Sequence, residues 1–201
     1  MLTLEDTSWL LAEQREESQP GDVFALGACV AIAFHHASTL CTKDNTDIDA
    51  VQDHDRVSSS LLVKVDNLRT GELPIADARF YLIYKMLLLL TRIYLRLPFE
   101  DSNPSARSEV VDLLAEFCHT ASEVDMPSLK IFNPVMSNFW VATCYLIRKE
   151  LQCEENHGRS LSARSKLVEG LDYLLHSLMA LSPEVPLKSY REKLEAIMPM
   201  L

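Results

Sequence analysis

The sequence predicts an all-α protein with a single multi-helix, bundle-like domain of about six to eight helices. Long segments repeat apolar residues every three to four positions, which is the period of an amphipathic helix. The 201 residues include only 5 glycines and 9 prolines, so turns should be few and helices long. No stretch shows the alternation of β-branched residues between turn signals that is typical of a strand.

The first 55 residues divide into three segments. Residues 1–21 are an N-terminal segment in which residues 4–17 can form a short helix, and Pro20-Gly21 breaks the chain after it. Residues 23–41, with Asp22 as N-cap, are apolar on nearly every side, which predicts a central buried helix. Residues 42–55 are acidic and poor in large apolar groups. They predict a solvated acidic loop within a helical domain that spans residues 22–201.

Two helices are expected next. The first begins near Arg56 and stops before Gly71 and Pro74, with an apolar stripe of Val57, Leu61, Val65 and Leu68. The second, residues 75–95, is the strongest helix of the chain. The pair Leu97-Pro98 stops it, because a proline disfavours the helical conformation in the residue before it. Its broad apolar face consists of Phe80, Ile83, Tyr84, Leu87, Leu88, Thr91, Tyr94 and Leu95.

In the second half of the chain, two Asn-Pro pairs, at 103–104 and 133–134, predict helix starts, since Asn is a favoured N-cap and Pro a favoured first residue. A short helix over residues 187–198 closes the chain. The helix that begins at Asn103-Pro104 has a core face of Val110, Val111, Leu114, Phe117, Cys118, Ala121 and Val124. The second, residues 135–151, has Phe139, Ala142, Leu146 and Leu151 on one face. A third, residues 161–181, carries Leu167, Leu171, Leu174, Leu175 and Leu178.

Charge and cysteine usage exclude several classes of protein. The net charge is −10, from 19 basic and 29 acidic residues, and the basic residues form no run. This balance disfavours direct contact with nucleic acid or with an anionic membrane surface. Five scattered cysteines indicate a reducing compartment and no disulfide framework. The apolar run 23–34 is too short to span a bilayer, and Lys85 and Arg92 interrupt the run 82–95.

No residue pattern supports catalysis, metal binding or a cofactor. His35-His36 and Cys118-His119 are neighbours in sequence, and adjacent side chains on a helix point about 100° apart. The acidic segment lacks the residue order of an EF-hand loop, and no phosphate-binding loop or nucleophile elbow occurs. Carboxylates at helical spacing indicate a solvated face; they are Glu109, Asp112 and Glu116. We therefore predict a protein that is not an enzyme, with no catalytic, metal-binding or cofactor-binding residues and no cofactor.

One set of polar side chains stands out on and just beyond the apolar helix 75–95. A pocket between helices that presents a few polar groups could hold a small effector. Alternatively, the basic side chains extend to solvent and the tyrosines pack at the edge of the core. We favour the second interpretation for this set, which consists of Tyr81, Tyr84, Lys85, Arg92, Tyr94 and Arg96.

Residues 80–99 read FYLIYKMLLLLTRIYLRLPF, a long apolar helix that ends in Leu95-Arg96-Leu97-Pro98-Phe99. This stretch resembles the regulatory domain, or middle homology region, of fungal zinc-cluster transcription factors, where such a helix ends in an L-x-R-P-F-like turn. The Pro-Phe pair is kept, whereas the arginine stands one place early with Leu97 in its position. Residues 108–124, 133–151 and 161–181 follow in the order of that family, so the likeness covers about residues 23–197 and corresponds to the C-terminal half of the domain.

The resemblance implies a nuclear regulatory and interaction domain that controls RNA polymerase II transcription. Its partners would be the transcription machinery or a full-length relative, and some members of the family sense small-molecule effectors. Pro98 and Phe99 join the candidate residues as positions of the family motif. The family contacts DNA through an N-terminal cluster of six cysteines with two zinc ions, but this chain has no C-x₂-C-x₆-C run.

We therefore expect the chain by itself to bind neither zinc nor DNA and to associate with no membrane. It would correspond to a fragment, a truncated product or a stand-alone relative of the family. The alternative is a helical adaptor or scaffold that is not tied to transcription, and without the family resemblance the expected location is the cytoplasm.

Overall fold

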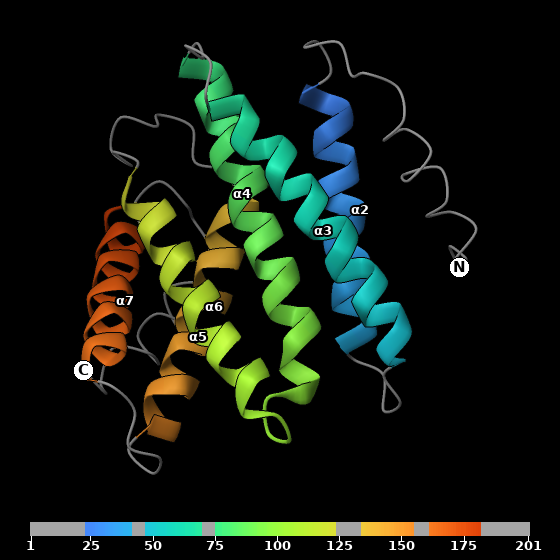
Figure 1. Cartoon of the computed structure of the whole chain (residues 1–201). Coiled ribbons are helices and arrows are strands. Elements are labelled where there is room, and N and C mark those ends of the chain that lie inside the picture. Colours follow the sequence, from blue (N-terminus) through green and yellow to red (C-terminus); the bar gives the residue numbers. More distant parts are fainter. Residues whose placement is uncertain (1–22, 42–46, 70–74, 124–133, 155–160, 182–201) are drawn as a thin grey trace. The chain divides into compact units, whose positions relative to one another are not determined.

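The computed structural model describes residues 23–41, 47–69, 75–123, 134–154 and 161–181. Within these ranges it contains six α-helices and one 3₁₀ turn and no strand, which confirms the all-α prediction (Figure 1). The helices expected over residues 4–17 and 187–198 lie outside the described residues. The elements are α2 (Val23–Cys41), α3 (Ile48–Arg69), α4 (Ile75–Arg96), η2 (Leu97–Phe99), α5 (Pro104–Ser122), α6 (Pro134–Glu154) and α7 (Leu161–Leu181).

The chain divides into two compact units, residues 1–95 and residues 96–201. The N-terminal unit contains α2, α3 and α4 up to Leu95, and the C-terminal unit contains Arg96, η2, α5, α6 and α7.

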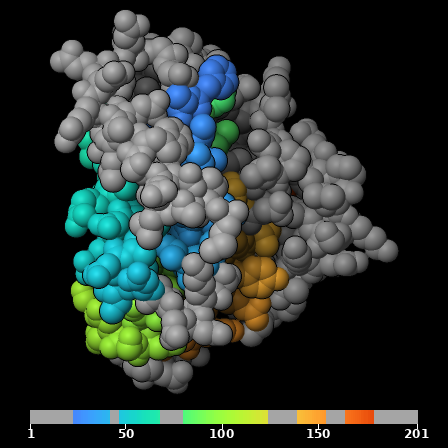
Figure 2. Space-filling view, turned by 90° about the vertical axis from the view of Figure 1, so that its right-hand side faces the viewer, coloured from blue at the N-terminus to red at the C-terminus, as the bar shows by residue number. Residues whose placement is uncertain are grey.

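In the N-terminal unit, α2 packs against α3, and the two helices lie side by side in the space-filling view (Figure 2). The prediction that α2 is a central buried helix is wrong. Only Val30, Ala33 and Ala37 are buried, and Phe24 remains 74% exposed. A helix that is apolar all round indicates no preferred face, so its sequence cannot tell how many sides its neighbours cover.

Among the described helices, α2 alone is long and apolar enough to cross a membrane. It has 19 residues and a mean hydropathy of 1.6, and 17% of its most apolar window is buried. Core helices of soluble proteins and signal segments have the same length and hydropathy. This property alone therefore assigns no location to the chain.

The acidic segment is helical from Ile48 onward, so the prediction of a loop over residues 48–55 is wrong; residues 42–46 are not described. Asp47 caps the helix, because its Oδ1 accepts hydrogen bonds from the backbone N–H groups of Asp49 at 3.0 Å and Ala50 at 3.4 Å. Acidic residues in a first turn also interact favourably with the helix dipole. The acidic composition that suggested a loop is therefore suited to a helix N-terminus.

The buried side of α3 consists of Val51, Ser58, Leu61 and Val65, with Ser58 in place of the predicted Val57. The Ser58 hydroxyl donates a hydrogen bond of 2.8 Å to the carbonyl of His54, which satisfies the buried polar group. In α4, the fully buried side chains, each at most 1% exposed, are Met86, Leu88, Leu89, Leu90, Thr91, Ile93 and Leu95.

In the C-terminal unit, α7 packs against both α5 and α6 (Figure 1). The predicted start of α5 is confirmed: Asn103 Oδ1 accepts from the backbone N–H of Ser105 at 2.9 Å and of Ala106 at 3.4 Å. The predicted stripe of α7 is confirmed as well, since Leu167, Leu171, Leu174, Leu175 and Leu178 are all buried.

The predicted inner face of α6 is wrong. Its buried side chains include Trp140, Val141, Cys144 and Ile147, whereas the predicted Phe139, Ala142, Leu146 and Leu151 are only partly buried. Apolar residues occur on several sides of this helix, so periodicity alone left its orientation open. Trp140, the largest fully buried side chain, defines the inner face.

Candidate functional site

Lys85 and Tyr81 of α4 converge on Asp66 of α3. Lys85 Nζ lies 3.3 Å from Asp66 Oδ1, and the Tyr81 hydroxyl donates to the same oxygen at 3.5 Å. Only 12% of the Lys85 side chain is exposed. Burial by itself would lower the pKa of Lys85, but Tyr81 and Asp66 raise it above its ordinary value. The ammonium is therefore a charged link between the two helices.

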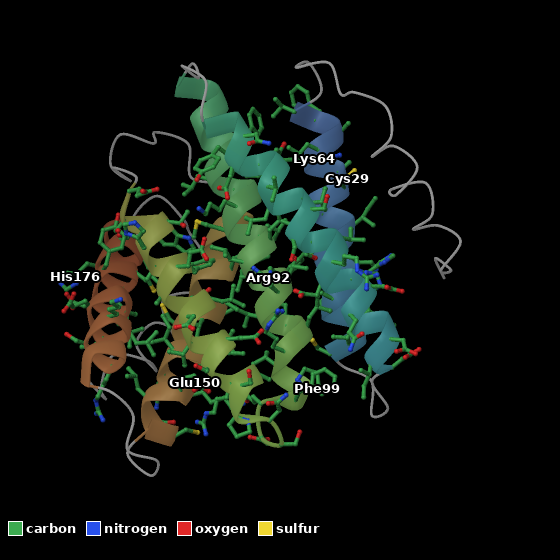
Figure 3. The ribbon with its side chains drawn as sticks, viewed as in Figure 1. Cys29, Lys64, Arg92, Phe99, Glu150 and His176 are labelled. Carbon is green, nitrogen blue, oxygen red and sulfur yellow. The ribbon has the colours of Figure 1, made fainter. Side chains whose placement is uncertain are left out.

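Arg92 forms a second link between α4 and α3, one that involves the predicted acidic loop. Its Nε lies 3.2 Å from Asp55 Oδ1, and both side chains are about three-quarters buried, with 24% and 28% exposed (Figure 3). Asp55 thus serves as a structural partner of α4.

The tyrosines of α4 pack at the edge of the N-terminal core. The Tyr84 and Phe80 rings lie 5.9 Å apart, and the Tyr94 ring lies 5.6 Å from Phe34 of α2. The backbone carbonyl of Tyr94 accepts a hydrogen bond from the Cys41 thiol. Burial raises the pKa of both phenols above the ordinary value. Neither hydroxyl is therefore adjusted for proton transfer near neutral pH.

The family-like segment at the end of α4 forms a tight turn into α5. Leu97–Phe99 is a 3₁₀ turn that contains Pro98, and the Phe99 carbonyl accepts from the backbone N–H of Asn103 at 2.8 Å and of Ser102 at 3.2 Å. Arg96 Nε donates to Glu109 Oε2 of α5. The turn from the end of α4 to the start of α5 is thus formed by Arg96, Pro98 and Phe99.

Two buried carboxylates near this turn were not predicted. Glu100 is 5% exposed and pairs with Lys149, and Glu150 is 2% exposed with Arg107 Nε 3.2 Å from its Oε2 (Figure 3). Charged residues in polar stretches are usually solvated, so no pattern of residues indicated the burial of these two carboxylates. The two pairs connect α5 and the preceding turn to α6.

The predicted effector set does not converge on one point. Tyr81 and Lys85 meet at Asp66, and Arg92 pairs with Asp55. The remaining members pack on aromatic rings or hold the turn after α4, as described above. An effector pocket at these positions stays a prediction, and the contacts agree with the alternative of helix packing.

A groove of about 630 Å³ lies on the C-terminal unit between α5 and α7. Cys118 and Gly170 are its buried members, and a Cβ atom added to Gly170 would lie 2.5 Å from Cys118 Sγ. The missing side chain therefore allows the helices to approach closely. The groove is lined by Asp112, Ala115, Glu116, Cys118, His119, Ser122, Lys166, Glu169, Gly170 and Tyr173.

The Cys118 thiol in this groove is not an activated nucleophile. Burial raises the pKa of Cys118 to about 12, so its thiol stays protonated near neutral pH. His119 is exposed, and its Nε2 lies 3.7 Å from Glu123 on the following turn. Cys118 is thus a core cysteine, and His119 is a surface histidine.

The histidines of the N-terminal unit form a contact between helices. The rings of His36 on α2 and His54 on α3 lie 5.3 Å apart at 90°, and His35 lies 6.1 Å from His36. Within the described ranges, no group of three or more His, Cys, Asp or Glu side chains could hold a metal ion.

Comparison of the chain with protein-family models, curated proteins and solved structures finds no match. The likeness to the fungal regulatory domain therefore rests on the sequence order of the segments quoted above.

Proposed function

We propose that the chain is a regulatory and protein-interaction domain of the fungal zinc-cluster transcription factor kind, which acts on RNA polymerase II transcription through protein partners. The observation that carries the proposal is the motif that ends the apolar helix α4. Arg96 and the Pro98-Phe99 pair form a tight turn at the end of α4. These residues shape the backbone where the helix ends. Their resemblance to the L-x-R-P-F-like turn of the family therefore supports the assignment.

The charge of the chain supports action through proteins. A net charge of −10 opposes binding to phosphates, and the sequence contains no six-cysteine cluster. In this proposal, contact with a promoter is made by a partner or by a covalently linked DNA-binding domain.

A tethering experiment tests the proposal. The chain is fused to a heterologous DNA-binding domain in yeast cells that carry a reporter gene. We expect reporter transcription to rise or fall relative to the DNA-binding domain alone. A fusion with Leu87→Asp, which places a carboxylate at a position that is 7% exposed, serves as the unfolded control.

The transcriptional role is contradicted if the fusion occupies the promoter, remains folded and leaves the reporter at the control level. That result would favour the alternative of an adaptor that is not tied to transcription.

A further inference from the structure

We propose that the groove between α5 and α7 binds a small organic cation that carries two or more ammonium groups on an apolar chain. This inference rests on the groove itself and does not depend on the proposed role in transcription.

The groove has the dimensions and the floor of a small-molecule site. Its volume of about 630 Å³ lies within the range of about 300–1,000 Å³ that such sites occupy. Ala115, Cys118 and Gly170 provide a surface without charged groups. The hydroxyl of Tyr173 donates to the carbonyl of Ala121 at 3.2 Å, which fixes the tyrosine where it lines the groove.

The charges that line the groove favour a ligand with positive charge. Asp112 and Glu116 on α5 and Glu169 on α7 provide carboxylates from both helices. The Ser165 hydroxyl donates to Glu169 Oε1 at 2.8 Å and holds that carboxylate in place. Among the described residues that line the groove, these three carboxylates stand against one lysine, Lys166. The excess of carboxylates attracts cations and repels anions.

An organic cation can interact with both the carboxylates and the uncharged floor of the groove, whereas a metal ion would interact with the carboxylates alone. Hard metal ions require six or more oxygen ligands, and the floor of Ala115, Cys118 and Gly170 supplies no side-chain oxygen. A flexible diamine or polyamine can place its methylene groups on that floor and its ammonium groups beside Asp112 and Glu169. An ammonium group near Tyr173 can also interact with the aromatic ring.

Calorimetric titration of the whole chain with spermidine at low salt tests this proposal. We expect saturable binding that weakens about fivefold to tenfold in the double variant Asp112→Asn/Glu169→Gln, which removes two charges without changing shape. Asp172→Asn is the matched control, because Asp172 lies exposed on α7, does not line the groove and contacts His176 at 3.2 Å. This control should bind spermidine like the original chain.

A second variant separates the groove from general surface charge. Ala115→Leu keeps every carboxylate but fills the groove, and we expect it to lose most of the binding. The proposal is overturned if spermidine does not bind, or if the double variant binds as tightly as the original chain. Unfolding curves of each variant establish that it is folded, and the isosteric double variant decides the matter if Ala115→Leu does not fold.

Discussion

At the scale of single residues, burial decides how much an ion pair contributes to the stability of this chain. Arg56 and Asp53 on α3 lie 2.7 Å apart, with 78% and 62% of their side chains exposed. Arg107 and Glu150 lie 3.2 Å apart, with only 18% and 2% exposed. Exposed pairs contribute less than about 1 kcal/mol, whereas removal of one partner from a buried pair costs about 3–5 kcal/mol.

We therefore predict that Arg107→Met lowers the free energy of unfolding by about 3 kcal/mol, because it removes the guanidinium beside a buried carboxylate. Arg56→Met is the matched control and should cost less than about 1 kcal/mol. Urea unfolding of both variants gives the comparison. Equal losses of unfolding free energy in the two variants would show that the buried pair contributes no more to stability than the exposed pair.

Gly170 carries a second prediction at this scale. In Gly170→Ala the new Cβ would lie 2.5 Å from Cys118 Sγ and 2.6 Å from Cys118 Cβ, so α5 and α7 must separate. Overpacking of this kind costs about 1–3 kcal/mol, which exceeds the gain of about 1 kcal/mol in helix propensity. We expect a net loss of stability in chemical denaturation.

Gly27→Ala provides the comparison for Gly170→Ala. There the added Cβ meets the far end of the Tyr84 side chain, with the hydroxyl at 2.2 Å, and a side-chain tip can move more easily than a Cβ fixed to a helix. The cost should therefore be smaller than at Gly170. A Gly170→Ala variant as stable as the original chain would contradict the close packing of α5 on α7.

At the scale of elements, local signals predicted helix ends better than helix faces. Asn103 and Pro104 gave the start of α5 correctly, since capping depends on neighbours in sequence. The start of α3 was missed because Asp47 and Asp49 suit a loop and a helix N-terminus equally well. The predicted burial of α2 and the predicted inner face of α6 were wrong, because apolar side chains on several sides of a helix leave its orientation to tertiary packing.

The contact between α2 and α3 should respond to pH through His54. Burial lowers the pKa of His54 below 6.5, the charge of His36 lowers it further, and Asp53 opposes the shift. The folded state therefore binds a proton less readily than the unfolded state. The stability that depends on neutral His54 is complete above about pH 6.5 and declines as the pH falls below that value.

Urea unfolding between about pH 8 and pH 5 measures this response. We expect His54→Gln to reduce the loss of stability on acidification, because glutamine does not titrate. Parallel profiles for the original chain and His54→Gln would refute the role of His54.

At the scale of the whole molecule, the all-α class was predictable, whereas the positions with functional potential were not. Helical periodicity and few turn residues are properties of the sequence itself, and they gave the class. The groove depends on Gly170 lying against Cys118, and the buried pairs depend on Arg107 meeting Glu150. In each case the two residues lie 43 or more positions apart in the sequence and on different helices. The periodicity of apolar residues within one helix does not predict such contacts.

The whole fold should depend on α4, whose apolar sequence led to both the fold prediction and the family resemblance. Leu87 is 7% exposed, so Leu87→Asp would bury a carboxylate among apolar side chains at a cost of several kcal/mol. Domains are stable by only about 5–15 kcal/mol, and we therefore expect a large loss of helical signal in far-UV circular dichroism.

Val63→Asp is the matched control for Leu87→Asp. It makes the same kind of change on α3 at a side chain that is 61% exposed, where a surface substitution alters stability by about 0.5 kcal/mol or less. Its spectrum should match that of the original chain. A native spectrum for Leu87→Asp would mean that α4 tolerates a charge on its buried side, and it would overturn the assignment of this helix to the core.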